Sequence, residues 1–244
     1  MLIILFFAGL IAGFINVMAG GGSALTLPIL IFLGLDGSIA NGTNRLAILI
    51  QNVFAVYGFS QNRLSAFRKS FGYAVVTLPG ALAGAFLATK LDNFWFNKIL
   101  AVVIIFIVFS MVLPKPNKKV EGTENGSKSQ LFLYLSLFGV GFYGGFIQAG
   151  VGFLLMATLF YLAGLDLIKV NMHKVFIVLI YTIPAFLVFA FSGNVDWLLG
   201  LVLAAGNGLG GWIGAHVSVK KGEKAIRLIL IVILIGMALK LFLF

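Results

Sequence analysis

The sequence predicts an all-α polytopic membrane protein built from two inverted repeats of about five helical segments each. Three observations predict this fold class. The 244 residues are 61% hydrophobic and 10% charged, with a mean hydropathy of +1.12, whereas soluble domains are only about half apolar. Apolar segments of helical length follow one another along the chain, and glycine-rich motifs recur in its two halves at a constant spacing. Finally, the basic residues gather in alternate loops.

Charge and residue usage exclude several classes of function. The net charge of +10 comes from lysines and arginines between apolar spans, which topology control explains better than a nucleic-acid surface. The absence of cysteine excludes disulfides and thiolate metal sites. Two histidines and seven carboxylates, nearly all in loops, argue against a catalytic metal cluster. No HExxH, GxSxG or P-loop motif occurs. We therefore expect no enzyme activity, no catalytic residues, no metal, no cofactor and no nucleic-acid partner.

Ten apolar segments justify the helical architecture. Most are near 20 residues, the length that a helix needs to span a hydrocarbon core about 30 Å thick. The second and seventh are shorter and each follows its half's glycine cluster, so they suit half-helices or re-entrant arms. The segments are roughly Leu2–Met18, Ser23–Gly34, Thr43–Ser60, Phe71–Thr89, Phe94–Leu113, Leu131–Gln148, Val151–Gly164, Val175–Phe191, Trp197–Ser218 and Ala225–Leu243.

Three consecutive glycines, Gly20, Gly21 and Gly22, separate the first two segments. Glycine costs about 1 kcal/mol relative to alanine inside a helix. A break at membrane depth is tolerated only where protein or a watery cavity satisfies the backbone. A weaker copy, Gly150 and Gly152, separates the sixth and seventh segments. Two broken helices at matching positions of two halves are the usual sequence sign of a transporter's binding site.

The two halves are repeats. Residues 1–113 form the first repeat, residues 114–130 a polar linker, and residues 131–244 the second repeat. At a shift of 130, Gly20 matches Gly150 and Asn41 matches Asn171. Outside the breaks we assign the repeated glycines to close helix packing, because small residues are favoured at membrane helix interfaces. These glycines are Gly9, Gly13, Gly80, Gly84, Gly210 and Gly214.

Loop charge predicts the orientation of the repeats. If all ten segments alternate sides, the loops after the odd-numbered segments share one face and hold 13 of the 17 basic residues. If each glycine break only kinks one long helix, the bias disappears. The positive-inside rule therefore favours five segments per half, a cytoplasmic linker and an inverted second half. The 13 residues are Arg63, Arg68, Lys69, Lys115, Lys118, Lys119, Lys128, Lys169, Lys174, Lys220, Lys221, Lys224 and Arg227.

The breaks carry the candidate binding groups. A helix that restarts at Ser23 or Phe153 exposes backbone N–H groups at a positive dipole end, which suits an anion. Amide side chains just before the breaks, Asn16 and Gln148, supply donors and acceptors. The candidate substrate-binding residues are Asn16, Gly20, Gly21, Gly22, Ser23, Asn41, Thr43, Asn44, Arg45, Gln148, Gly150, Gly152, Asn171 and Lys174.

Two cations follow the breaks. We expect Asn41 and Asn171 to cap the next helices, which places Arg45 and Lys174 in first turns, the wrong end for a cation in the helix dipole. An anionic ligand would relieve that conflict. The alternative is a solvated or snorkelling cation beside an ordinary cap.

Other polar side chains within the spans are expected to face the bundle interior or a cavity, many of them only bonding helix to helix. They are Gln51, Asn52, Tyr57, Thr77, Tyr181, Thr182, Asn207 and His216. No Asp or Glu lies in the middle of a span, so a buried carboxylate relay has no candidate.

The motifs resemble a known family. The run Gly13-Phe-Ile-Asn16, Ala19-Gly20-Gly21-Gly22-Ser23, Pro28, Gly34 and Ala40-Asn41-Gly42-Thr43-Asn44 resembles the first-half motif of the TauE/SafE family of sulfite and organosulfonate exporters. Gly144-Gly-Phe-Ile-Gln148-Ala-Gly150-Val-Gly152 resembles that family's second motif. The second half departs from this pattern, because it has Met172-His173-Lys174 where the first has Gly42-Thr43-Asn44.

The resemblance implies a secondary transporter or facilitator in the bacterial inner membrane that exports a small sulfur-containing anion. Alternating access would come from one repeat rocking against the other. Expected partners are the anion, the lipid bilayer and a second copy of the chain in a homo-oligomer. The alternatives are a carrier of another small solute or a metal cation, and a membrane scaffold whose glycines serve packing only.

Overall fold

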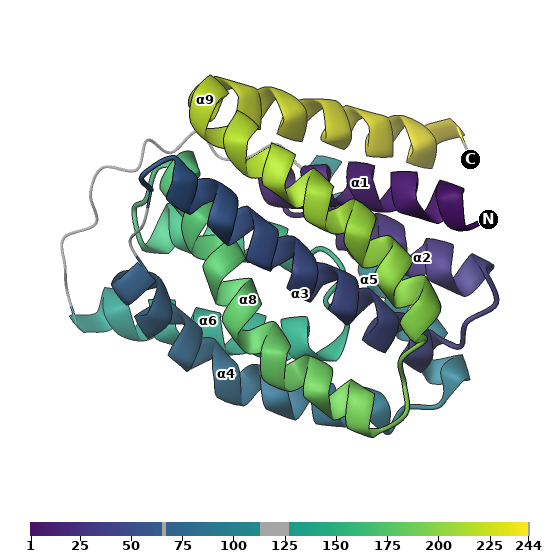
Figure 1. Ribbon diagram of the computed structural model, residues 1–244. Helices are drawn as coiled ribbons and strands as arrows, with labels where there is room; N and C mark the ends of the chain where they lie inside the picture. The colour runs from purple at the N-terminus through teal and green to yellow at the C-terminus, as the bar shows by residue number, and fades with distance from the viewer. Residues whose placement is uncertain (65–66, 113–126, 244) are drawn as a thin grey trace.

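The computed structural model describes residues 1–64, 67–112 and 127–243, and its regular elements are all helical (Figure 1). Four of the described helices are long and apolar enough to cross a membrane, and large apolar side chains such as Phe32 and Phe191 lie on the outside. The all-α, multi-pass membrane fold is therefore confirmed. The elements are α1 Leu2–Ala19, α2 Ser23–Phe32, α3 Gly37–Gln61, α4 Phe67–Thr89, α5 Asn93–Val112, α6 Ser127–Phe146, α7 Val151–Ala157, the π-helical turn Thr158–Leu162, α8 Leu167–Phe191 and α9 Trp197–Leu243.

Two helices begin earlier than the hydropathy predicts. α3 begins at Gly37 and α8 at Leu167, so the helix caps are Asp36 and Asp166 and the expected caps at Asn41 and Asn171 are wrong. The Asp166 carboxylate accepts the backbone N–H of Lys169 at 2.9 Å. Hydropathy places both starts too late, because polar residues such as Asn41, Asn171 and Lys174 lie just beyond the first turn of each helix. Arg45 and Lys174 consequently lie inside their helices, beyond the first turn.

Left-handed residues mark both helix breaks. The end of α1 is capped by Gly20 with φ +90°, and between α6 and α7 both Gln148 and Gly150 are left-handed, with φ +66° and +69°. This conformation is easy for glycine but costs other residues about 1–2 kcal/mol. α9 contains a comparable break at Gly222, with φ +67° and ψ −164°. At this point the chain turns back, so α9 forms two limbs in Figure 1.

Glycines bring the helix pairs α1–α9 and α4–α6 into backbone contact. A Cβ on Gly9 would lie 2.8 Å from the Leu203 carbonyl oxygen of α9, and one on Gly141 would lie 2.9 Å from the Thr77 Cα of α4. Gly13, Gly80, Gly84, Gly210 and Gly214 also face the helix opposite at close range. The packing role that the sequence assigned to these glycines is confirmed.

The packing pattern is unchanged when the two halves are exchanged. α1 packs on α9 as α6 packs on α4, and α3 packs on α9 as α8 packs on α4. In Figure 1 the N-terminus and the last described residues lie at the same end of the bundle. Residues 114–126 of the predicted linker lie outside the described residues, and Ser127–Gln130 opens α6. The repeat boundaries and the inverted orientation stay predictions.

Candidate functional site

The two helix breaks cross at a pair of glycines in the middle of the bundle. A Cβ on Gly152 would lie 2.5 Å from the Gly20 carbonyl oxygen, and one on Gly20 would lie 2.8 Å from the Gly152 Cα. Because these neighbours are all backbone atoms, no side chain could be added at either position without separating the segments. The shared glycines of the two halves therefore meet each other directly.

Ser23 joins the first residue of α2 to the second break. Its hydroxyl donates to the Gln148 carbonyl oxygen at 3.0 Å and accepts the Gly150 N–H at 3.1 Å. The serine is buried, so both backbone groups of the left-handed segment are satisfied by a side chain from the other half. This contact helps to hold Gln148 in its strained conformation.

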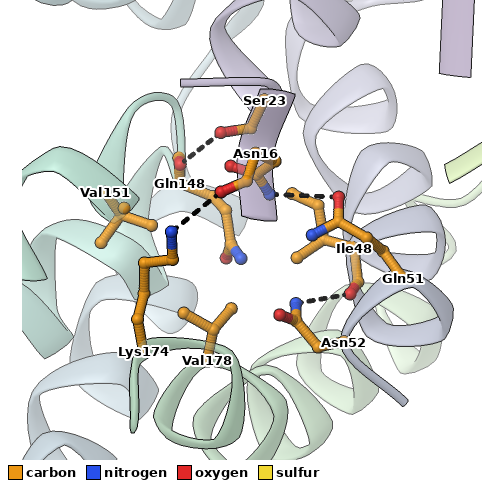
Figure 2. A pocket seen from close by; sticks show the side chains of 10 residues that line it. Asn16, Ser23, Ile48, Gln51, Asn52, Gln148, Val151, Lys174 and Val178 are labelled. Atoms are coloured by element: carbon orange, nitrogen blue, oxygen red, sulfur yellow. Dashed lines mark hydrogen bonds between the residues drawn. The ribbon is translucent and has the colours of Figure 1, made fainter. Parts of the chain in front are cut away.

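A small cavity lies beside the crossing, between α1, α2, α3, α7 and α8 (Figure 2). Its volume is about 10 Å³, which is the room that one water molecule needs. A larger solute would therefore enter only if the surrounding helices moved apart. The lining residues are Asn16, Ser23, Ile48, Gln51, Asn52, Gln148, Val151, Gly152, Lys174 and Val178.

The cavity has a polar and an aliphatic part. The Asn16 side-chain amide donates to the Gln51 Oε1 at 3.1 Å, which links α1 to α3. Asn52 donates to a carbonyl of its own helix at 2.7 Å. Ile48, Val151 and Val178 supply the aliphatic wall. Amide groups can both donate and accept, so this lining can adjust to a polar guest.

Lys174 is buried at the cavity wall and binds the end of the first broken helix. Its ammonium donates to the carbonyl oxygens of Asn16 at 3.0 Å and Val17 at 2.8 Å, both in the last turn of α1. It also contacts the Asn171 Oδ1 at 2.8 Å. A cation is favourable at a helix C-terminus. The conflict expected for a first-turn cation does not arise, because Lys174 lies beyond the first turn of α8 and caps the end of α1.

Arg45, on α3 of the first half, binds the end of α6 in the second half in the reciprocal arrangement. Its fully buried guanidinium donates to the Gly144 carbonyl at 3.1 Å, to the Gly145 carbonyl, and to the Gln148 Oε1 at 2.8 Å. The guanidinium also lies 4.6 Å from the centre of the Phe189 ring. Gly144 and Gly145 are in the last turn of α6, so Arg45 caps the helix before the second break. The Arg45 Nε lacks a hydrogen-bond partner.

Neither cation has an acidic partner. Among the described residues an ion pair forms only between Lys169 and Asp166, at 2.8 Å on the surface. Neutral groups, namely backbone and amide carbonyl oxygens and the Phe189 ring, therefore surround the two buried charges. The helices before both breaks end against Arg45 and Lys174, and both cations are buried.

The structure brings most of the predicted binding residues to this region. Asn16, Ser23, Gln148, Gly152 and Lys174 line the cavity. Gly20, Gly22, Gly150, Arg45 and Asn171 contact those five residues.

The remaining four have other neighbours. Asn41 donates to the Phe146 carbonyl at 2.8 Å, and Thr43 accepts the Asp196 N–H at 2.9 Å. Asn44 accepts from Thr26 at 2.6 Å, and Gly21 faces the Phe153 ring.

Sequence reasoning left five lining residues out of the site. Gln51 and Asn52 stood out as polar residues within a span, and their spacing from Ile48 places all three on one face of α3. Val151 and Val178 carry no sequence signal, because aliphatic residues are everywhere in this chain. Thr182, also expected to face inward, accepts from the Gln148 Nε2 at 3.3 Å.

Comparison with known proteins gives a consistent result. The family model described as sulfite exporter TauE/SafE matches residues 5–241. A probable membrane transporter protein, ORF9, of Sinorhizobium sp is 32% identical over 99% of this chain and 92% of its own length. One from Haemophilus influenzae is 30% identical over 99% and 94%, and YfcA of Escherichia coli K12 is 29% identical over 98% and 88%. No solved structure matches. The chain belongs to the sulfite exporter TauE/SafE family of membrane transporters.

Proposed function

We propose that the chain is a secondary transporter or facilitator that exports a small sulfur-containing anion, sulfite or an organosulfonate, across the inner membrane. The observation that carries this proposal is the pair of buried cations beside the central cavity, Arg45 and Lys174, with no acidic partner among the described residues. Sulfite itself comes from the description of the family.

The electrostatics favour an anion over a cation. A buried charge that faces only carbonyl dipoles is less well compensated than one that faces an opposite charge. An oxyanion in the cavity would find Lys174 on one side and the positive N-terminal end of α2, at Ser23, on another. A divalent cation would meet a positive field, and no cluster of three His, Asp or Glu side chains occurs in the described part of the chain.

Alternating access is the transport mode that suits this architecture. The cavity is too small for sulfite as it stands, so the halves must separate for the anion to enter. The matching helix pairs of the two halves, α1–α9 with α6–α4 and α3–α9 with α8–α4, together with the loop charges, support an inverted repeat. Such a repeat can open toward either side of the membrane around one fixed site. The linker would then be cytoplasmic.

Flux of labelled sulfite in proteoliposomes tests the proposal. The wild-type protein should move sulfite faster than empty vesicles, and a short alkyl sulfonate should compete. Gln51→Leu, which removes a cavity amide, should lower the flux at least tenfold. The matched control Gln61→Leu lies on the same helix but outside the cavity, where Gln61 bonds the indole of Trp212.

Each other outcome contradicts a defined part of the proposal. Flux of a neutral solute or a metal ion without anion flux would make the chain a carrier of that solute. No flux of any solute would favour a membrane scaffold. Equal flux through Gln51→Leu and wild type would place the transport path elsewhere.

A further inference from the structure

The two buried cations are held in different ways, although both cap a broken helix. The Arg45 fork is fixed on three sides, by two carbonyl oxygens of α6, by the Gln148 amide oxygen and by the Phe189 ring. A planar guanidinium bound through several N–H groups has little freedom to turn. Arg45 is absent from the cavity lining, and the Gln148 side chain lies between it and the cavity.

Lys174, unlike Arg45, is held loosely enough to exchange its hydrogen-bond partners. Its ammonium lies at the cavity wall and faces Asn16 across the cavity edge (Figure 2). A lysine carries a compact charge on a flexible stem, and its three donors rotate freely. Its oxygen partners, two backbone carbonyls and the Asn171 amide, are all neutral. The ammonium can therefore change partners without leaving its position in α8.

Resting on the anion transport proposed above, we propose that Lys174 binds the anion directly by releasing the Asn16 and Val17 carbonyls, while Arg45 stays as the fixed cap of α6. The present bonds join a charged donor to neutral carbonyls, whereas an oxyanion carries a full opposite charge, whose attraction for the ammonium is strong in a buried site. An oxyanion oxygen is therefore a better partner for the ammonium than either carbonyl. Arg45 gains less, because it lies outside the cavity lining and three oxygens already hold the two terminal nitrogens of its guanidinium.

The exchange links binding to movement. The Asn16 and Val17 carbonyls belong to the last turn of α1, in the first half, whereas Lys174 belongs to α8 in the second. When the ammonium turns to the anion, a bridge between the halves opens beside the contact of Gly20 with Gly152. A ligand shifts a conformational equilibrium by its differential affinity for the two states. The anion would thus favour the state in which α1 and α8 are separate.

Matched lysine variants test the assignment by their effect on sulfite transport. Lys174→Gln should raise the sulfite KM roughly 10- to 100-fold, which corresponds to the loss of a hydrogen bond to a charged group. Lys174→Arg keeps the charge and should restore part of the affinity. Lys169→Gln is the matched control, because Lys169 is an exposed lysine on the same helix, paired with Asp166. Arg45→Lys should mainly lower the melting temperature, because one ammonium cannot replace the fork.

Amide hydrogen exchange distinguishes direct binding from a purely structural role of Lys174, because a structural role predicts no sulfite-dependent change in exchange. Saturating sulfite should speed exchange of the amides in the last turn of α1 in the wild type, and should have no such effect in folded Lys174→Gln. A wild type that transports sulfite without this change would overturn the release of the carbonyls. A normal KM in Lys174→Gln, with transport intact, would overturn the binding role alone. A wild type that transports no anion would overturn both this inference and the proposed function.

Discussion

Replacing Gly152 by alanine tests whether the contact between the two helix breaks is as tight as the geometry indicates. The new Cβ would lie 2.5 Å from the Gly20 carbonyl oxygen and 2.8 Å from its carbonyl carbon. Ordinary contacts of a Cβ begin at 3.4 Å. The crossing segments must therefore separate by about 1 Å, since both obstacles are backbone atoms that cannot rotate away. Gly152 is not among the residues with positive φ, so alanine adds no conformational strain.

The size of the effect follows from two opposing contributions. Overpacking of a tight site costs about 1–3 kcal/mol, and replacing glycine by alanine in a helix returns up to about 1 kcal/mol. A net loss of about 1–2 kcal/mol lowers the melting temperature of a chain of this length by roughly 2–8 °C. Transport should fall as well, because the separation is at the cavity.

Thermal unfolding in detergent and sulfite flux in proteoliposomes are the two assays. Gly139→Ala is the control, because Gly139 lies on α6 with no atom within 4 Å of the added Cβ, and it should melt at or slightly above the wild-type temperature. A Gly152→Ala protein that melts and transports like the wild type would refute the reasoning. In that case the glycines at the breaks would not be required for close approach.

Two further predictions concern the residues around the second break. Gln148→Gly and Gln148→Ala both lose the bonds to Arg45 and Thr182. The glycine variant should nevertheless melt about 2–4 °C higher, because the φ of +66° costs alanine about 1 kcal/mol; equal melting temperatures would contradict the left-handed conformation. Ser23→Ala removes the partner of the Gly150 N–H and should cost about 1 kcal/mol, seen as a lower melting temperature. Ser192→Ala, at an exposed serine bonded to its own helix, is the control, and identical losses in the two variants would show that the bridge contributes nothing.

Much of the fold could be predicted because its signals are local. Apolar runs identify the spans, and the glycine clusters identify both breaks, since each depends on residues that are neighbours in sequence. The starts of α3 and α8 were missed for the same reason. Polar residues just beyond the first turn, such as Asn41 and Asn171, resemble loop residues, and only the Asp36 and Asp166 positions that precede the helices mark the start.

The candidate site was predicted in part. Asn16, Ser23 and Gln148 flank the breaks and do line the cavity. Asn44 is a candidate hydrogen-bonding amide of the Asn41–Arg45 motif, but its side chain accepts a bond from Thr26. Each residue of a helix is rotated by about 100° from the residue before it, so adjacent polar residues face different partners. Val151 and Val178 could not be chosen, because an aliphatic wall looks the same in sequence as a lipid-facing surface.

Hydropathy and glycine content can be recognised in short stretches of chain, so sequence alone predicts a multi-pass helical membrane protein with one glycine break in each half. The role of the buried cations depends on contacts between distant residues, which appear only in the folded chain. Arg45 and Gly144 are 99 residues apart, and Lys174 and Val17 are 157 apart. Judged against its own helix, each cation seemed to lie at the wrong end of a dipole. Folding places each at the carbonyl end of a helix from the other half, where the same charge is stabilising.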